Sequence, residues 1–371
     1  MTKIYTIALC AIIFSSTISY GQDPSFSQFY ANRIYLNPAF TGIENGVSFA
    51  GTSRTQWAKV DQGFRTYIAS VEFQEPFLRS GFGLSVFHDT QGIMQLNTTS
   101  VALSYAYMIP MNRHNLHFGL QGSWVQKSVD WEKIVFSDEI DPVFGAVNPT
   151  TAVPYLDKIT FTDFDAGILW RFENDIKIGK QVFRDARTSI GLSVHHLPYL
   201  FLKNTGNESF QNLYTQTNPR LTFHAGIVLP LFYFNGKKKK LAISPNLKYD
   251  MQGGDFLNPN NSLQVFTYGL FLLYEGLYFG IYYQNRNPIP EIQNTSALIF
   301  AAGAYVNTGR KDRRQFFIGF SYDANMTGLS SRAGGVYELA LRWTISPEAS
   351  LFANNEKRKS GKRILDCNNF F

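Results

Sequence analysis

The sequence has few charged residues, almost no cysteine and only one long apolar run. Charged residues make up 17% of the 371 residues, whereas about a quarter is usual in globular proteins. The only cysteines are Cys10 and Cys367, and one thiol remains once an N-terminal leader is removed, so no intrachain disulfide is expected. After the leader no apolar run approaches about 18 residues, which excludes membrane-spanning helices.

The single apolar run has the pattern of a secretory signal peptide. Lys3 supplies a positive charge before the apolar stretch from Ile4 to Phe14, and small residues precede an expected cleavage site between residues 21 and 22. Cys10 lies inside the apolar stretch and follows Leu9, which argues against a lipoprotein anchor. The sequence therefore predicts a cleaved leader and export from the cytoplasm.

Aromatic residues are abundant, and the mean hydropathy is intermediate. Phe and Tyr number 33 and 20, aromatics total 16%, and the mean hydropathy is −0.14. Such a value is too polar for a helical membrane protein. It suits a transmembrane β-barrel, in which lipid-facing and lumen-facing side chains average out.

A period of two in side-chain polarity recurs along the chain. From Tyr337 to Ile345 the odd-numbered residues are large and apolar, while the even-numbered ones are charged, small or hydroxylated. Most segments with this pattern have roughly ten or more residues, enough for a tilted strand to cross a bilayer. We predict fourteen strands, at about 44–57, 63–74, 80–88, 96–109, 114–126, 160–172, 187–196, 219–234, 240–250, 262–274, 277–285, 295–307, 315–325 and 333–345.

These strands predict an all-β, antiparallel up-and-down barrel in the outer membrane of a Gram-negative bacterium. The barrel must close, because lipid cannot satisfy open strand edges. An even strand count places both barrel ends of the chain on one side, which we expect to be periplasmic. The longest connections (127–159 and 197–218) then lie outside the cell, and most periplasmic turns are short, with 173–186 as a longer one. The expected parts are a leader (1–21), an N-terminal segment at or in the barrel (22–43), the barrel (44–346) and a basic periplasmic tail (347–371).

Basic residues gather on the predicted periplasmic rim and in the tail. Two readings remain open: anchoring of exposed turns, or an electrostatic dock for a periplasmic partner. The candidate docking residues in the turns are Lys237, Lys238, Lys239, Lys240, Arg310, Lys311, Arg313 and Arg314.

Several short motifs stand in a fixed order from residue 22 to about residue 345. The first is Asp-Pro-Ser-Phe-Ser-Gln, followed by Asn-Pro-Ala-Phe-Thr-Gly, which holds turn-forming residues. Next come Arg-Thr-Gln-Trp at the end of the first strand, Ser-Tyr-Asp, and a final Gly-Gly-Val-Tyr-Glu-Leu strand. The motif residues singled out are Asn37, Pro38, Gly42, Arg54, Gln56, Trp57, Tyr322, Asp323, Gly334 and Glu338.

With these motifs the chain resembles the PorP/SprF family, outer-membrane proteins of the type IX secretion and gliding machinery of Bacteroidota. The resemblance implies a barrel linked to periplasmic secretion components, and in some members to one large secreted adhesin. The basic C-terminal tail is also similar to the family's end, but Asn368 stands where a Pro is expected, so no function of the tail is carried over.

The sequence offers little support for catalysis, metal binding or nucleic-acid binding. Six scattered histidines and one remaining cysteine do not give metal-ligand spacing, and no cofactor is expected. His195 falls on a polar strand face beside Ser193, which leaves a barrel lipid hydrolase as a weak reading against that of ordinary lumen histidines. The acidic residues 138–141 suit a calcium ligand set less well than a solvated loop.

The lumen is the remaining open question. Arg54, Asp165, Arg171, Asp323, Glu338 and Arg342 fall on polar faces, where they could line a channel or pair into a network, with Glu338 and Arg342 expected to pair. Inward aromatics such as Phe317 favour a filled lumen. We expect a non-enzymatic secretion component, with a passive pore for small or hydrophobic solutes as the alternative.

Overall fold

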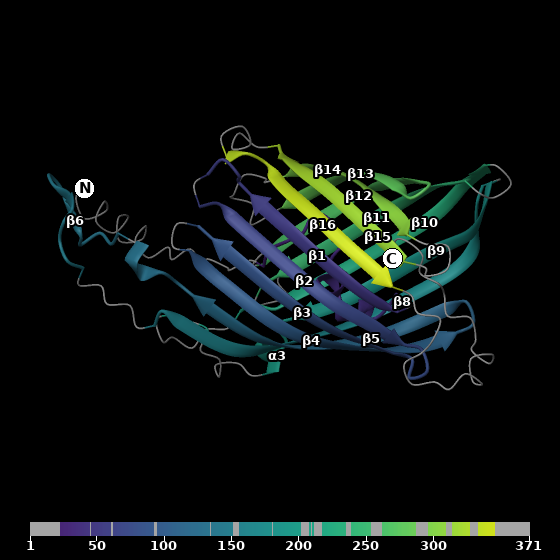
Figure 1. Cartoon of the computed structure of the whole chain (residues 1–371), viewed down its shortest axis with the longest axis horizontal. Coiled ribbons are helices and arrows are strands. Elements are labelled where there is room, and N and C mark those ends of the chain that lie inside the picture. The colour runs from purple at the N-terminus through teal and green to yellow at the C-terminus, as the bar shows by residue number, and fades with distance from the viewer. Residues whose placement is uncertain are drawn as a thin grey trace, which may run out of the picture.

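Fourteen antiparallel strands close into a barrel (Figure 1), and residues 23–44 pack inside it. The computed structural model describes residues 23–44, 46–60, 62–92, 95–133, 135–150, 156–179, 181–201, 208, 210, 217–234, 239–253, 262–286, 296–308, 314–326 and 333–345. The predicted leader and tail lie outside these residues. The predictions of an all-β class and of fourteen barrel strands are confirmed.

The barrel strands follow one another around the wall in chain order, interrupted only by a small separate sheet. They are β1 (Val47–Gln56), β2 (Phe64–Glu75), β3 (Ser80–Gln91), β4 (Leu96–Met111), β5 (His114–Ser128), β8 (Lys158–Ile178), β9 (Gln181–His195), β10 (Arg220–Phe234), β11 (Lys239–Gln252), β12 (Leu263–Tyr274), β13 (Leu277–Arg286), β14 (Ala297–Thr308), β15 (Arg314–Asn325) and β16 (Val336–Ile345).

The first and last strands pair with each other and close the wall. Their antiparallel register runs from Val47 opposite Ile345 to Gln56 opposite Val336. This pairing gives both strands two neighbours, so the main-chain groups of the wall are satisfied within it.

Side chains of β16 show why this sequence forms a wall between lipid and lumen. Tyr337 and Trp343 are 43% and 41% exposed on the outer face, whereas Glu338 and Arg342 are 1% and 5% exposed on the inner face. Successive side chains of a strand point to opposite faces, so the sequence alternation becomes an apolar exterior and a polar interior.

The two ends of the barrel differ in their connections. At one end, called here the short-turn end, the turns after β2, β4, β8, β10, β12 and β14 are brief, and β1 begins and β16 ends there. At the other, called the long-loop end, connections run between residues 128 and 158 and between 195 and 220.

The expected connection at 173–186 is wrong. Strands β8 and β9 continue through it and pair as far as Ile178 opposite Gln181, with an irregularity between Asn174 and Ile176. Phe183 packs there in a small apolar cluster with residues of the neighbouring hairpin. This stretch contains several charged residues, which obscured the strand pattern in the sequence. The hairpin extends beyond the neighbouring strand β5, where charged side chains are tolerated on both faces.

Short elements complete the described structure. The 128–158 connection holds the 3-10 turn η2 (Trp131–Lys133) and a two-stranded sheet of β6 (Ile140–Asp141) and β7 (Gly145–Ala146). Helix α3 (Pro198–Phe201) follows β9, while α2 (Arg33–Leu36) and η1 (Pro38–Phe40) precede the barrel wall. Among the described residues, no helix has the length and apolarity needed to span a membrane.

Candidate functional site

The segment of residues 23–44, called here the plug, lies inside the barrel. Phe26, Phe29, Tyr30 and Phe40 are each at most 3% exposed. Several plug residues share one apolar core with inward wall residues, which include Leu169, Phe271, Tyr278, Tyr282 and Phe317. The aromatic side chains of the N-terminal segment therefore serve as a core for the lumen.

The Asn-Pro-Ala-Phe-Thr-Gly motif folds into a capped turn within the plug. The Asn37 side chain accepts a hydrogen bond from Ala39 N (2.9 Å) and so caps η1, whose first residue is Pro38. Gly42 has a φ of +64°, which favours glycine, and an added Cβ there would lie 2.6 Å from Phe73 O. The motif thus turns the chain from the plug towards β1.

The plug also approaches the wall backbone closely. A Cβ on Gly119 of β5 would lie 2.1 Å from Ala39 N and 2.3 Å from the carbonyl carbon of Pro38. Asn37 Nδ2 donates to the carbonyl oxygens of Ile168 (3.1 Å) and Leu192 (3.2 Å). Glycine in the wall lets the backbone of the plug make contact where a larger residue would not fit.

A first ionic group, the Arg54 cluster, ties the plug to β1, β15 and β16. Glu338 accepts hydrogen bonds from the backbone N–H groups of Ser27 (2.9 Å) and Gln28 (2.8 Å). Arg54 Nη1 donates to Ser27 Oγ at 2.8 Å and lies 3.4 Å from both Asp323 Oδ2 and Glu338 Oε2. Three charges that would be costly to bury singly are therefore held together around the plug.

A second group, the Glu44 cluster, holds the other end of the plug at the short-turn end. Glu44 Oε1 lies 2.8 Å from Arg33 Nη1 and 3.1 Å from Arg342 Nη1. Arg342 Nη2 also donates to Ala31 O (2.6 Å). Burial alone would raise the pKa of Glu44, but Arg33 and Arg342 outweigh burial and hold that pKa below its usual value.

The expected pairing of Glu338 with Arg342 is wrong. Glu338 binds Arg54 and the plug backbone, whereas Arg342 binds Glu44 and the plug backbone. Four residues along a strand cover roughly 13 Å, too far for direct contact. The plug, which lies between them, supplies partners for both side chains.

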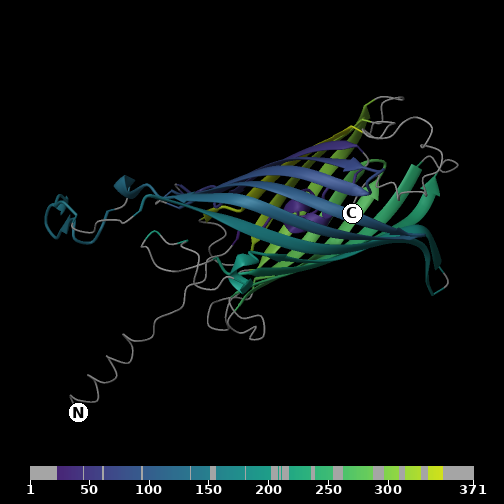
Figure 2. The same cartoon turned by 90° about the horizontal axis from the view of Figure 1, so that it is seen from below.

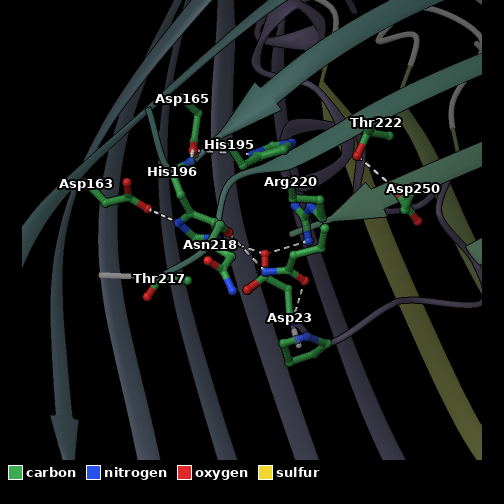
Figure 3. A network of polar contacts seen from close by, with 12 residues as sticks. Asp23, Asp163, Asp165, His195, His196, Thr217, Asn218, Arg220, Thr222 and Asp250 are labelled. Atoms are coloured by element: carbon green, nitrogen blue, oxygen red, sulfur yellow. Dashed lines mark hydrogen bonds and ion pairs between the residues drawn. The ribbon is translucent and has the colours of Figure 1, made fainter. Parts of the chain in front are cut away.

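A third group, the Asp23 cluster, fixes the start of the plug at the long-loop end (Figure 3). Asp23 Oδ2 lies 2.9 Å from His196 Nε2 and 3.0 Å from Arg220 Nη1. His196 Nδ1 lies 2.5 Å from Asp163 Oδ2, and Asp23 N donates to Gln252 Oε1 (3.0 Å). The plug therefore runs the length of the lumen, from the long-loop end at Asp23 to the short-turn end at Glu44.

The charges of this cluster support one another. Burial alone would raise the pKa of Asp23, but His196 and Arg220 together hold it well below its ordinary 3.8. Burial alone would lower the pKa of His196, but Asp23 and Asp163 raise it well above 6.5. At neutral pH the cluster therefore holds a protonated His196 between two carboxylates.

The structure brings Ser193, His195 and Asp165 together in the order of a hydrolase triad. Ser193 Oγ lies 3.2 Å from His195 Nε2, and His195 Nδ1 lies 3.4 Å from Asp165 Oδ1. Ser193 Oγ donates to Leu36 O (2.8 Å), and His195 Nε2 lies 3.4 Å from the same oxygen. All three side chains are buried. The carbonyl oxygen of Leu36, in the plug, occupies the place that a substrate would have to enter.

A small cavity of about 40 Å³ lies between the plug and the wall near the long-loop end. Its lining includes Asp23, Phe29, Asn32, Arg220 and Lys248. By this measure one water needs about 10–15 Å³, so the cavity has room for water but not for a ligand of ordinary size.

The remaining motif residues lie at the long-loop end near the β1–β16 seam. Gln56 Oε1 accepts from Arg54 Nη2 (3.3 Å), and the Trp57 ring packs edge-on against Phe64 at 5.0 Å. Trp57 N donates to Gly335 O (3.2 Å) beside Gly334, whose φ is +79°. In the last two strands, the ring of Tyr322 contacts that of Tyr337 at 5.1 Å.

The side chains of the predicted docking residues lie outside what the structure describes. Lys237, Lys238, Arg310, Lys311 and Arg313 fall in gaps between strands. Of Lys239, Lys240 and Arg314 only the backbone is described, at the starts of β11 and β15.

Sequence reasoning missed several residues that fix the plug. Asp23, Ser27, Glu44 and His196 carry the contacts described above but were not among the candidate site residues. The available signal was weak: two acids and a run of aromatics in a segment without strand alternation. Among the described residues, no group of three or more His, Cys, Asp or Glu is arranged to hold a metal ion.

Several solved structures are distantly similar to this chain. They include CdiB from Acinetobacter baumannii (12% identity, TM-score 0.42, 80% of this chain and 59% of that chain). A Pseudomonas aeruginosa FadL homologue has 11% identity and a TM-score of 0.36 (81% and 89% covered), and the CymD monoaromatic hydrocarbon channel has 10% and 0.39 (88% and 94%). The chain thus spans 59% of the length of CdiB. No curated protein matches the sequence.

A family comparison is more informative. Residues 18–343 match the family described as "Type IX secretion system membrane protein PorP/SprF". The match includes the plug and all but the last two residues of the barrel wall. The chain therefore belongs to the PorP/SprF family of type IX secretion system membrane proteins.

Proposed function

We propose that the protein is a non-enzymatic scaffold of type IX secretion in the outer membrane. In this role it holds a secreted surface protein, an adhesin, at its long-loop end and contacts periplasmic secretion components at its short-turn end. The family match supports the secretion context. The observation that carries the scaffold role is a lumen filled by the plug and fixed by three ionic clusters.

The filled lumen weighs against the passive-pore alternative. A pore needs a continuous polar path, whereas the plug and the inward wall residues share one buried core. The small cavity beside the plug is far below the size of a typical ligand site, about 300 Å³ or more.

Topology and charge support the proposed orientation. Bacterial barrels place short turns in the periplasm and longer loops outside. The lysine- and arginine-rich turns then fall on the periplasmic rim, where they can attract an acidic partner.

Affinity purification from solubilised membranes tests the scaffold role. Wild-type protein with a C-terminal tag should recover periplasmic secretion components or a large surface protein. Replacing Lys237, Lys238, Lys239 and Lys240 with Gln should reduce recovery of the periplasmic partner, while a Lys133→Gln control should not. Recovery of neither class by the wild type contradicts the proposal.

Conductance in planar bilayers separates the scaffold from the pore. The wild-type protein should show no steady open channel at neutral pH. A stable conductance from the folded wild-type barrel would favour the pore instead.

A further inference from the structure

The connection between β5 and β8 forms an arm that projects from the long-loop end. Figures 1 and 2 show it extending well beyond the other described parts of the barrel. Its tip is the hairpin of β6 and β7, whose two strands pair only with each other among the described residues. This arm is therefore not part of the wall that lipid surrounds.

The tip carries the three most exposed of the described apolar side chains of the arm. Val143 and Phe144 are 81% and 77% exposed and Val147 is 60% exposed, and Ile140 beside them is 54% exposed. Outward side chains on the strands are shielded by lipid, but these four lie on a loop beyond the strand ends. Exposed apolar groups gathered in such a place indicate an interaction site.

The backbone of the tip is held in one conformation by hydrogen bonds. Asp141 Oδ1 accepts from the N–H groups of Val143 (2.8 Å) and Phe144 (2.9 Å). Glu139 O accepts from Val147 N and Asn148 N, both at 3.1 Å, and closes the loop at its base. An aromatic side chain displayed on an ordered turn loses little conformational entropy on binding, as is typical of interface anchors.

The charge of the tip is of one sign. Residues 135–150 contain Asp138, Glu139 and Asp141 and no lysine or arginine. The backbone N–H groups of Phe144 and Val143 lower the pKa of Asp141, so that this carboxylate is ionised at neutral pH. Carrying ionised carboxylates into the hydrocarbon of a bilayer is costly, which argues against insertion of the tip into lipid.

We propose that the tip of the arm, Ile140, Val143, Phe144 and Val147, docks into an apolar pocket with a basic rim on the secreted surface protein. The inference rests on the proposed scaffold function and adds the binding surface and the chemistry of the partner. Phe144 is the central anchor, and the carboxylates of Asp138 and Glu139 pair with the basic rim.

The central test compares three kinds of cell: those that carry the double variant Val143→Ser/Phe144→Ser, wild-type cells, and a deletion strain that lacks this protein altogether. Quantitative proteomics measures each secreted protein on the cell surface and in the medium. In the tip variant, the ratio of medium to surface should rise at least about tenfold for one secreted protein. This is the size expected for loss of an aromatic anchor. The deletion strain should move the same protein.

A matched control removes apolar groups at the same end but away from the tip. The double variant Val60→Ser/Phe201→Ser replaces two exposed side chains in other connections (43% and 76%) and should leave retention unchanged. Barrel folding is checked in each strain by heat-modifiable mobility on gels. If the deletion releases a protein and the folded tip variant does not, the inference fails and the scaffold function stands. If the deletion releases nothing, the scaffold function itself fails.

Two further measurements test the chemistry of the partner. The variant Asp138→Lys/Glu139→Lys should weaken retention, and stronger or unchanged retention would contradict the basic rim. In vesicles containing brominated phosphatidylglycerol, the Phe144→Trp variant should show no quenching beyond that of the wild type. Additional quenching would show that lipid, and not a protein pocket, receives the tip.

Discussion

At the scale of single residues, Arg54 has the largest expected effect on stability. It is the cation between Asp323 and Glu338, all three at most 3% exposed. Arg54→Ala leaves two buried carboxylates without their cation, which should destabilise the barrel by about 3–5 kcal/mol. The measurement is urea unfolding of the refolded barrel in detergent micelles. The exposed Arg65 is the control, since Arg65→Ala should change stability by less than about 0.5 kcal/mol.

His196 makes the anchoring of the plug at Asp23 dependent on pH. Its folded pKa is raised, so its contribution is present at low and neutral pH and is lost as pH rises through the folded pKa. The pKa of Asp23 is lowered, so its contribution is present above about 4 and is lost as pH falls. The other charged groups that face His196 are Asp163, Asp165 and Arg220, with His195 adjacent.

Hydrogen exchange of residues 23–30 measures this dependence. After correction for chemical exchange, protection in the wild type should fall as pH rises above neutral. His196→Gln should remove protection already at pH 6 and flatten the profile, whereas His88→Gln, on β3, should resemble the wild type. Equal profiles for His196→Gln and the wild type would show that His196 does not anchor the plug.

At the scale of elements, the plug and the wall are matched to each other in shape. Gly119→Ala places a Cβ against the backbone of Ala39 and Pro38. Backbone atoms cannot move aside as the end of a flexible side chain can. We expect a loss of at least about 1–3 kcal/mol, together with conductance where the plug is displaced. Gly122→Ala, on the same strand, meets only the ring of Phe164 at 3.3 Å and serves as the control. A Gly119→Ala barrel that is as stable as the wild type and shows no conductance would contradict this packing.

The elements also show what the sequence could and could not predict. Alternation predicts each barrel strand, because the contrast between lipid and lumen acts on every residue of the wall. The extension of β8 and β9 was missed because it projects beyond the neighbouring strand β5. Its residues face neither lipid nor lumen there, so they do not follow the apolar–polar alternation that marks the other strands. The partners of Glu338 and Arg342 were also missed, because pairing rules within a strand hold no information about a segment three hundred residues earlier in the chain.

At the scale of the whole molecule, the direction of the plug places its first described residue at the long-loop end. Asp23 lies at the long-loop end, on the same side as the arm, although β1 begins at the opposite end. An epitope inserted before Asp23 should therefore be reached by antibody from the same side as one in the arm at residue 149. An epitope at Gly179, on the β8–β9 turn, should be reached only from the other side, and a shared side for residues 23 and 179 would contradict this path.

This path also sets an order for assembly. The wall, sealed by β1 and β16, surrounds a plug whose first described residue, Asp23, lies at the long-loop end. The barrel must therefore either close around the plug or have the plug threaded into it after closure. The apolar leader expected at residues 1–21 would make threading harder, so we expect its removal to come first. Cells making a Gly21→Pro variant that retains the leader should accumulate unsealed chains that migrate identically on gels with and without heating. If the leader expected at residues 1–21 is cleaved, we propose that this cleavage precedes closure of the wall.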